Sequence, residues 1–297
     1  MTVPVAQLPD SRGSALVLAG GGLAGIAWEL GVLRGIADAD PALAGRVLAA
    51  ELVVGTSAGS SVAAQITSGA ALDDLYAAQL RPAAAEIEVD VDMSKLFAEF
   101  GAAMAGASGP VDAGRRIGAL ALAAPTVDPG VRLAVIDARL PVKQWPVGRR
   151  MLVSAVDAET GELTVFTGES GVALVDAVAA SSAVPGVWPP VAIGGRRYID
   201  GGVRSMTNAD LAAGADRVLI IQPLLTGAPQ PWGSLDAEIA ALDPAAVYVI
   251  GADQASADAF GANPLSPSTR APSARAGRAV GAAHAAGVAA LWRSAGG

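Results

Sequence analysis

Short apolar runs alternate with helix-like stretches along the first 68 residues of the chain. Residues 14–19 (SALVLA) are apolar and end at a run of glycines, which predicts a buried strand. Residues 23–37 are apolar on most sides of a helical projection, which predicts a helix packed against a sheet. Residues 51–54, followed by a second glycine-containing turn and a small-residue helix, repeat this order. Strand, glycine turn and helix in succession are typical of a parallel α/β fold.

The rest of the chain continues this pattern after an interruption. Residues 71–130 are rich in Asp, Glu, Pro and Gly, and we expect them to form a helical lid or cap. Further strands are predicted at residues 133–136, 151–156, 163–166, 197–199, 218–221 and 247–250, and further helices at 173–181 and 275–292. The second and third of these strands are expected to form a hairpin around the sequence AETG.

Composition narrows the possible chemistry. Of 297 residues, 52% are hydrophobic and 16% charged, which allows a large core and excludes global disorder. The chain has no cysteine and one histidine, so we expect neither a metal site nor a disulfide, and no cofactor is implied. The net charge of −8 argues against nucleic acid as a partner, because neutralising phosphates requires a basic face.

We expect the protein to be cytoplasmic. The first 14 residues lack the features of a signal peptide, and no apolar stretch reaches the roughly 18 residues needed to cross a membrane. Because the net charge is negative, any contact with a membrane surface is expected to be peripheral, apolar and transient. The sequence leaves the oligomeric state open.

The first glycine turn, GGGLAG at residues 20–25, has two chemical interpretations. It matches G-x-G-x-x-G between a predicted strand and a predicted helix, and Asp38 or Asp40 lies near the distance of a ribose-binding acid, which suggests a dinucleotide site. The same backbone N–H groups at a helix N-terminus would stabilise any anion, including an oxyanion. Alternatively, the glycines only allow strand and helix to pack closely.

The second glycine turn, GTSAG at residues 55–59, matches G-x-S-x-G between a predicted strand and a predicted helix. This is the setting of a nucleophile elbow, in which Ser57 projects its hydroxyl from the edge of the sheet. Gly55 and Gly59 would remove side chains that clash as the helix folds back. The alternative is that Ser57 only caps the helix.

A serine nucleophile needs a base. His284 lies in an Ala-rich helix without an acidic residue nearby in sequence, so we expect it to be structural. Asp200 follows a predicted strand and precedes Gly201-Gly202, where it could accept the proton of the serine directly. The alternative is an ordinary turn aspartate.

Taken in this order, the motifs GGGLAG, GTSAG and DGG resemble those of the patatin-like phospholipase family, as do residues 153–166 and 179–202. The resemblance covers about residues 14–225. It implies a three-layer α/β/α sandwich with a mostly parallel sheet, in which residues 71–130 form the lid or cap. We expect residues 226–297 to add a strand and a helix to the same domain.

The resemblance also implies residue roles. Ser57 would be the nucleophile and Asp200 the proton acceptor of a dyad that needs no histidine. Oxyanion donors would be the backbone N–H groups of Gly20, Gly21, Gly22, Leu23 and Ala58. The remaining motif glycines are Gly25, Gly55, Gly59, Gly201 and Gly202. The chain departs from the family at Ala24, where Arg or Lys is common, so a contribution of that charge to headgroup binding is in doubt.

The function expected from these features is that of a serine lipid acyl hydrolase of the phospholipase A or carboxylesterase type, with a lipid or acyl ester as substrate. The alternatives are a nucleotide-binding protein that uses GGGLAG and a catalytically silent scaffold. An acyl chain requires an apolar trough, for which the candidates are Val184, Val187, Trp188, Pro189 and residues 93–104. These residues could equally be ordinary core.

Overall fold

A computed structural model of the chain describes residues 13–82, 85–225 and 234–293. The N-terminal segment searched for a signal peptide therefore lies almost entirely outside the described residues. The strands are β1 (Ser14–Leu18), β2 (Leu52–Thr56), β3 (Arg150–Asp157), β4 (Leu163–Phe166), β5 (Val191–Ile193), β6 (Arg196–Asp200), β7 (Arg217–Leu225) and β8 (Ala246–Ala252). The α-helices are α1 (Gly22–Ala39), α2 (Pro41–Leu48), α3 (Ala58–Thr67), α4 (Leu72–Gln79), α5 (Met93–Met104), α6 (Pro110–Ala123), α7 (Pro129–Arg139), α8 (Leu174–Ser181), α9 (Leu235–Ala240), α10 (Gln254–Phe260) and α11 (Arg270–Arg293). Short 3-10 helices are η2 (Gly201–Val203), η3 (Ala209–Ala212) and η4 (Pro267–Thr269).

The strands form one sheet in the order β5-β6-β3-β2-β1-β7-β8, with β4 paired to β3. Neighbours from β3 to β8 along this order are parallel, whereas β4, β5 and β6 join their neighbours antiparallel. The predicted mostly parallel α/β fold is confirmed, and so is the hairpin of β3 and β4. Strands buried on both faces read as continuous apolar runs, which is why the sequence pattern located them.

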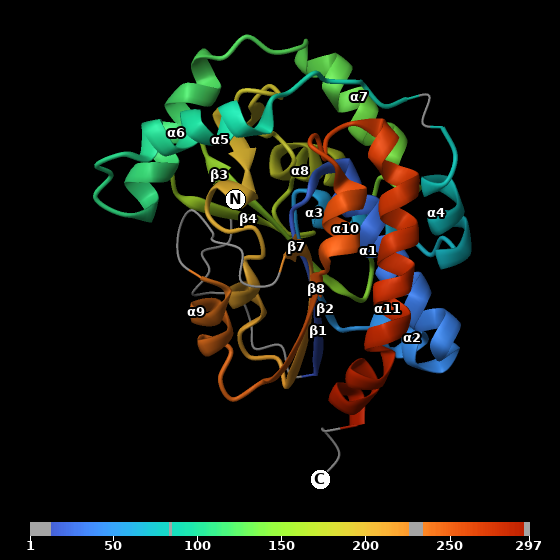
Figure 1. The fold of residues 1–297 in the computed structure, drawn as a ribbon. Helices are drawn as coiled ribbons and strands as arrows, with labels where there is room; N and C mark the ends of the chain where they lie inside the picture. The colour runs from blue at the N-terminus through green and yellow to red at the C-terminus, as the bar shows by residue number, and fades with distance from the viewer. Residues whose placement is uncertain (1–12, 83–84, 226–233, 294–297) are drawn as a thin grey trace.

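Helices cover the two faces of the sheet unequally. In Figure 1, α1, α3, α10 and α11 lie to the right of the sheet, and α9 lies to its left. Leu16 and Leu18 of β1 belong to the core beneath the long helices. The alternating residues Ala15 and Val17 pack on the other face, against residues of η3 and near α9. The three layers are therefore present, and the third consists in the described chain of short helical segments.

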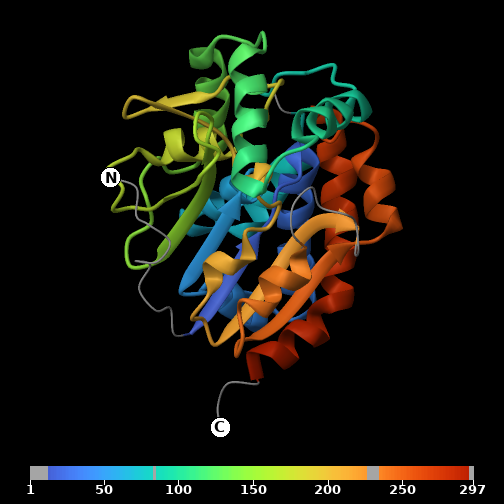
Figure 2. The same ribbon diagram turned by 90° about the vertical axis from the view of Figure 1, so that its left-hand side faces the viewer.

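The segment predicted as a lid or cap contains α4, α5 and α6. Figures 1 and 2 show α5, α6 and α7 together above one end of the sheet. Ile117 and Ala121 of α6 form a small core with Val156 of β3 and Ile199 of β6. None of the helices in the described chain combines the length and the hydropathy that a membrane span requires.

The strand predicted at residues 133–136 is wrong, because these residues lie in α7. Asp128 caps this helix, and its side chain accepts hydrogen bonds from the backbone N–H groups of Gly130 and Val131. Pro129 occupies the first helical turn, where its fixed φ and missing N–H are tolerated. The Asp-Pro pair was the start signal of a helix, and it outweighs the short apolar run that follows.

Beyond residues 226–233, which lie outside the described residues, the chain rejoins the same layers. β8 pairs in parallel with β7, and α11 packs along α1. The two helices touch through glycines. A Cβ added at Gly281 would lie 2.0 Å from the carbonyl oxygen of Val32, and one added at Gly35 would lie 2.0 Å from that of Arg278. The helix backbones are therefore too close for any side chain at these positions.

A glycine at the contact between α1 and α11 and a glycine in open space should respond in opposite ways to substitution by alanine. Gly281→Ala should lower the free energy of unfolding by about 1–3 kcal/mol through overpacking. Gly45→Ala in α2, where a Cβ meets nothing within 4 Å, should raise it by up to about 1 kcal/mol through helix propensity. Urea unfolding measures both values, and a neutral or stabilising Gly281→Ala would contradict the packing described.

Candidate active site

Ser57 occupies a strained turn between β2 and α3. Its φ of 52° and ψ of −114° lie in a region that residues with a side chain rarely adopt. Such a conformation costs on the order of 1–3 kcal/mol and persists only where the surroundings enforce it. A Cβ added at Gly59 would lie 2.1 Å from the carbonyl oxygen of Leu18, so only glycine lets α3 begin this close to β1. The turn lifts the Ser57 side chain off the edge of the sheet.

The hydroxyl of Ser57 donates a hydrogen bond of 2.7 Å to Oδ2 of Asp200, a residue 143 positions away. Strand register explains the meeting. Thr56 of β2 is paired with Ser154 of β3, and the next residue of β3, Ala155, is paired with Asp200 of β6. β3 lies between β2 and β6 and thus brings the end of β2, which precedes Ser57, into register with Asp200 at the end of β6. Both are buried, with 7% of Ser57 and 5% of Asp200 exposed.

The Asp200 carboxyl is held in an environment that makes it a stronger base. Burial raises the pKa of Asp200 to about 6. The hydrogen bonds from Ser57 and from the N–H of Gly202, at 2.7 Å, and the charge of Arg132 oppose this rise. An aspartate with a pKa near 6 is ionised at pH 7, yet it accepts a proton more readily than one with the usual value of about 3.9.

The glycine turn and the serine turn open into one small pocket. Gly22, Leu23, Ser57 and Ala58 line it. The first two begin α1 and the last begins α3, so the positive ends of two helix dipoles face the same space. Gly22 has a φ of +66°, which glycine adopts without strain. Such a corner stabilises an anion or a developing oxyanion.

Gly20 has to be removed from the predicted oxyanion donors. Its N–H donates a hydrogen bond of 2.8 Å to the carbonyl oxygen of Met206. A donor already used in this way cannot bind an oxyanion without breaking that bond. The hydrogen bonds within the described residues leave Gly21, Gly22, Leu23 and Ala58 as the candidates.

The acids proposed for ribose binding serve other purposes. Asp40 caps α2 by accepting a hydrogen bond of 2.9 Å from the N–H of Leu43. Asp38 is paired with Arg34 at 2.9 Å and with Arg278 at 2.5 Å. Both lie at the end of α1, whereas the ribose-binding acid of a dinucleotide site follows the second strand. In this chain β2 is followed by Ser57.

The remaining predicted residues divide between the site and other parts of the fold. Nδ1 of His284 lies 2.9 Å from the hydroxyl oxygen of Tyr248, while the Ser57 hydroxyl binds Asp200. Of the residues predicted to line an acyl trough, Val184 and Trp188 line the pocket beside Ser57. Val187, Pro189 and residues 93–104 are not among the lining residues of the described chain.

Two serines support the strained turn and were not singled out from the sequence. Oγ of Ser181 accepts a hydrogen bond of 2.8 Å from the N–H of Ser57. The hydroxyl of Ser182 donates to the carbonyl oxygen of Ser57 at 3.3 Å. They stand together in AASSAVPG, so the pair of small polar residues after a helix was the available signal.

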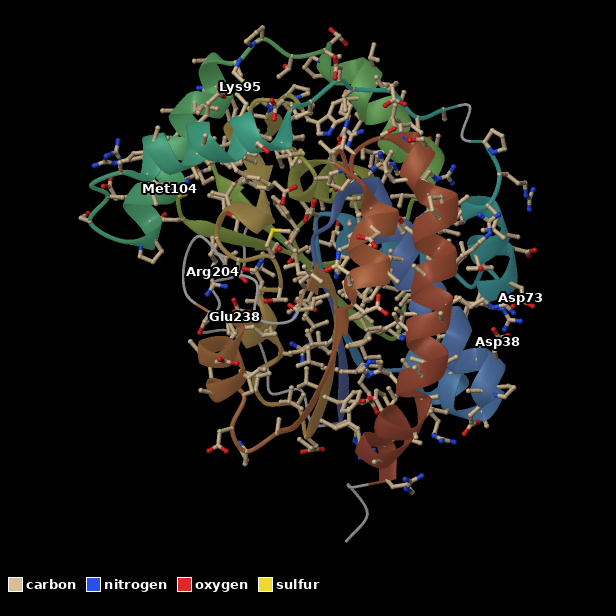
Figure 3. The ribbon with its side chains drawn as sticks, viewed as in Figure 1. Asp38, Asp73, Lys95, Met104, Arg204 and Glu238 are labelled. Atoms are coloured by element: carbon tan, nitrogen blue, oxygen red, sulfur yellow. The ribbon has the colours of Figure 1, made fainter. Side chains whose placement is uncertain are left out.

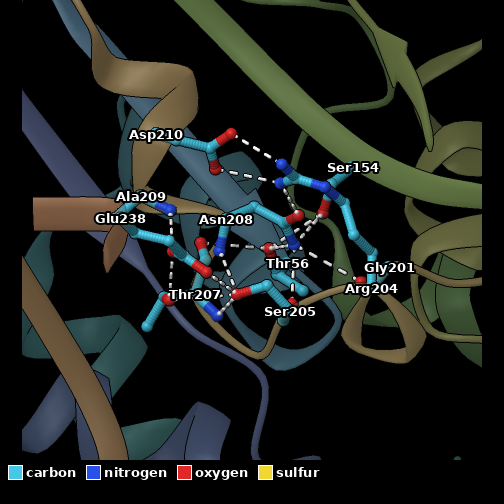
Figure 4. Close-up of polar contacts among 10 residues, drawn as sticks. All are labelled: Thr56, Ser154, Gly201, Arg204, Ser205, Thr207, Asn208, Ala209, Asp210 and Glu238. Atoms are coloured by element: carbon cyan, nitrogen blue, oxygen red, sulfur yellow. Dashed lines mark hydrogen bonds and ion pairs between the residues drawn. The ribbon is translucent and has the colours of Figure 1, made fainter. Parts of the chain in front are cut away.

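A buried polar network connects the two halves of the site (Figure 4). The side-chain amide of Asn208 donates to Oγ1 of Thr56 at 3.1 Å and to the carbonyl oxygen of Gly201 at 3.3 Å. Thr56 precedes Ser57 and Gly201 follows Asp200, so one side chain, that of Asn208, connects the two turns that carry Ser57 and Asp200. No motif marked this residue. Its left-handed backbone, with a φ of 48°, is visible only in the structure.

The carboxylate of Glu238 fixes the loop that carries Asn208. It accepts hydrogen bonds from the hydroxyls of Ser205 and Thr207 and, at 2.6 Å, from the N–H of Ala209. Figure 3 shows Glu238 and Arg204 on the same side of the sheet as α9. α9, on this face of the sheet, therefore holds in place the loop that carries Asn208. Within the described ranges, no cluster of three or more His, Cys, Asp or Glu side chains could hold a metal ion.

The fold and the site define an α/β protein with a serine on a strained strand-to-helix turn and a buried aspartate in direct contact with it. The chain matches the family model described as patatin-like phospholipase over residues 16–213, and it belongs to that family. The search of the curated proteins found no match.

Solved structures with a similar fold were also found. VipD from Legionella pneumophila is 13% identical, with a TM-score of 0.38, and the match covers 85% of this chain and 54% of that one. The type III effector protein ExoU is 14% identical, with a TM-score of 0.40, and the match covers 93% of this chain and 53% of that one. The chain thus spans about half the length of these two proteins.

The environment of Asp200 predicts its titration. Carbon-13 NMR of the aspartate carboxyls, assigned by comparison with Asp200→Asn, should show a midpoint near pH 6. Ser57→Ala should move this midpoint upward, because it removes a hydrogen bond that stabilises the ionised form. A midpoint near the usual value of about 4, or one that Ser57→Ala leaves in place, would contradict the contact between the two side chains.

Proposed function

We propose that the protein is a serine lipid acyl hydrolase that cleaves fatty acyl esters through Ser57 and Asp200. One observation carries the proposal: the buried hydrogen bond of 2.7 Å between Ser57 and Asp200, beside the N-termini of α1 and α3. A carboxylate can act as the base only in direct contact with the hydroxyl, because no histidine stands between them. Membership in the patatin-like phospholipase family supports lipid esters as the substrate class.

The reaction would proceed by two acyl transfers. As Oγ of Ser57 attacks the ester carbonyl, its proton passes to Asp200, and the negative charge on the carbonyl oxygen is stabilised by the N–H groups of Gly21, Gly22, Leu23 and Ala58. The carbon–oxygen bond of the ester then breaks, and the alcohol or lysolipid leaves with the proton from Asp200. Asp200 next takes a proton from water, which attacks the acyl-serine. The bond between the acyl carbon and Oγ then breaks, and Asp200 returns the proton to Oγ, which releases the fatty acid and restores the Ser57 hydroxyl.

A lipid can enter only after part of the site moves. The cavity beside Ser57 has a volume of about 20 Å³, enough for a single water molecule, whereas pockets for small molecules measure roughly 300–1,000 Å³. Glu86 and Ile87, from the segment 71–130, line this cavity. We therefore propose that the part of this segment around Glu86 and Ile87 moves as a lid, while α6 stays packed on β3 and β6. Phe97 on α5, 58% exposed, is the apolar side chain that would touch a lipid surface transiently.

Substitutions at Ser57, Asp200 and His284 should show which of these residues take part in the reaction. Ser57→Ala and Asp200→Asn should each lower kcat for p-nitrophenyl ester hydrolysis by at least about a thousandfold, because each removes a group that acts on the reacting atoms. His284→Ala should change kcat by less than about twofold. Substrates of increasing acyl length would reveal the chain-length preference. A silent scaffold would show no turnover by the wild type, and loss of activity in His284→Ala alone would overturn the dyad.

The pH dependence of kcat/KM follows from the pKa of Asp200. The base must be ionised, and its pKa is raised to about 6, so activity is present above that value and lost as the pH falls through it. At pH 5 the rate should be about a tenth of its plateau. A rate that stays flat down to pH 4 would exclude Asp200 as the proton acceptor.

A further inference from the structure

Arg132 is a buried cation beside the proposed nucleophile. It lies on α7, lines the same pocket as Ser57, and is only 6% exposed. Its guanidinium stacks on the ring of Trp188, 3.8 Å from the ring centroid. Contact with an aromatic face stabilises the cation and holds it in one orientation. No motif in the sequence marks Arg132, which directly precedes the residues predicted as a strand, 133–136.

The guanidinium of Arg132 makes no hydrogen bond to the described residues, and its Nη1 is fully buried without a partner. The neighbouring Arg139 is different, since its Nε and Nη2 bind both carboxylate oxygens of Glu86, at 2.8 and 2.7 Å. Burial and the charge of Arg139 lower the pKa of Arg132 to about 9, so the side chain stays charged at pH 7. A buried donor without a partner is costly, so Nη1 of Arg132 is free to bind an acceptor that the described residues do not supply.

We propose that Arg132 binds the phosphate group of a phospholipid substrate and so selects phosphate-bearing esters over neutral ones. This rests on the proposed acyl hydrolase function. The planar guanidinium donates two parallel hydrogen bonds to phosphate oxygens, which is the geometry for which arginine is favoured.

Movement of the lid would make this position more attractive to an anion. The carboxylates that act on Arg132 are those of Glu86 and Asp200. Glu86 is already bound to Arg139 and belongs to the segment that must leave the cavity. Its departure would leave two arginines facing one carboxylate. The stack on Trp188 does not involve this segment, so Arg132 would remain beside Ser57 as the site opens.

A purely electrostatic role is the competing explanation, because the charge of Arg132 also lowers the pKa of Asp200. The two roles differ in their dependence on substrate. A charge that acts only through Asp200 affects every ester equally and shifts the acidic limb of the pH profile. A phosphate contact affects only esters that carry the phosphate.

The experiment compares dihexanoyl phosphatidylcholine with dihexanoylglycerol, which has the same acyl chains and no phosphate. Above pH 7, Arg132→Met should lower the ratio of kcat/KM for the phospholipid to kcat/KM for the neutral lipid by about ten- to a hundredfold, the loss typical of a charge-assisted hydrogen bond. Arg132→Lys should recover part of the ratio. Arg115→Met, at an exposed arginine on α6, is the matched control and should leave the ratio unchanged.

A binding measurement, which does not depend on turnover, distinguishes a lipid headgroup from free phosphate as the ligand of Arg132. Calorimetry with inorganic phosphate and with glycerophosphocholine is performed on the wild type, Arg132→Met and Arg115→Met. Binding of either probe that Arg132→Met abolishes supports the subsite, and the tighter probe identifies the source of the phosphate. An unchanged substrate ratio together with no Arg132-dependent binding would overturn the inference. Failure of the wild type to hydrolyse any ester would instead overturn the proposed function.

Discussion

The contact between the Ser57 hydroxyl and the Asp200 carboxylate is the interaction on which the rest of this structure depends. A buried carboxylate is costly unless hydrogen bonds compensate it, and here the hydroxyl and the N–H of Gly202 do so. The same burial raises the pKa of Asp200 to about 6, which is the property that the proposed role of proton acceptor requires. Removal of either side chain would leave the other buried without this hydrogen-bond partner.

Close backbone packing is the condition that allows this contact. The strained turn at Ser57 exists because α3 begins against β1, at a distance that a side chain on Gly59 would forbid. The N–H of Ser57 donates a hydrogen bond to Ser181, and the amide of Asn208 donates one to Thr56, so that both bonds hold the turn in place. The long helices α1 and α11 approach through glycines in the same manner. At both places a glycine allows two backbones to approach, and the hydrogen bonds behind the site oppose a relaxation of the strained turn.

Much of the fold could be predicted from hydrophobic periodicity and glycine turns. Buried strands such as β1 and β7 are continuous apolar runs, and the sheet they form is mostly parallel, as expected. The short apolar run at residues 133–136 predicts a strand and yet lies in α7, because so few residues cannot distinguish a strand from one face of a helix. The Asp128-Pro129 pair before it is a helix start signal. Asn208 and Arg132 could not be found from sequence, since their importance arises from neighbours far away in the chain. Gly20 satisfied its motif, yet Met206 occupies its N–H, which only the three-dimensional arrangement reveals.

Covalent labelling tests the pairing of Ser57 with Asp200 most directly, because it records the nucleophile itself and not the fate of a chosen substrate. The protein is treated at pH 7.5 (about 1.5 units above the Asp200 midpoint) with a fluorophosphonate, and the adduct is located by peptide mass spectrometry. The account predicts one phosphonyl group, on Ser57, formed at least about a hundredfold more slowly in Asp200→Asn. An adduct on another residue, or labelling of Asp200→Asn at the wild-type rate, would contradict it.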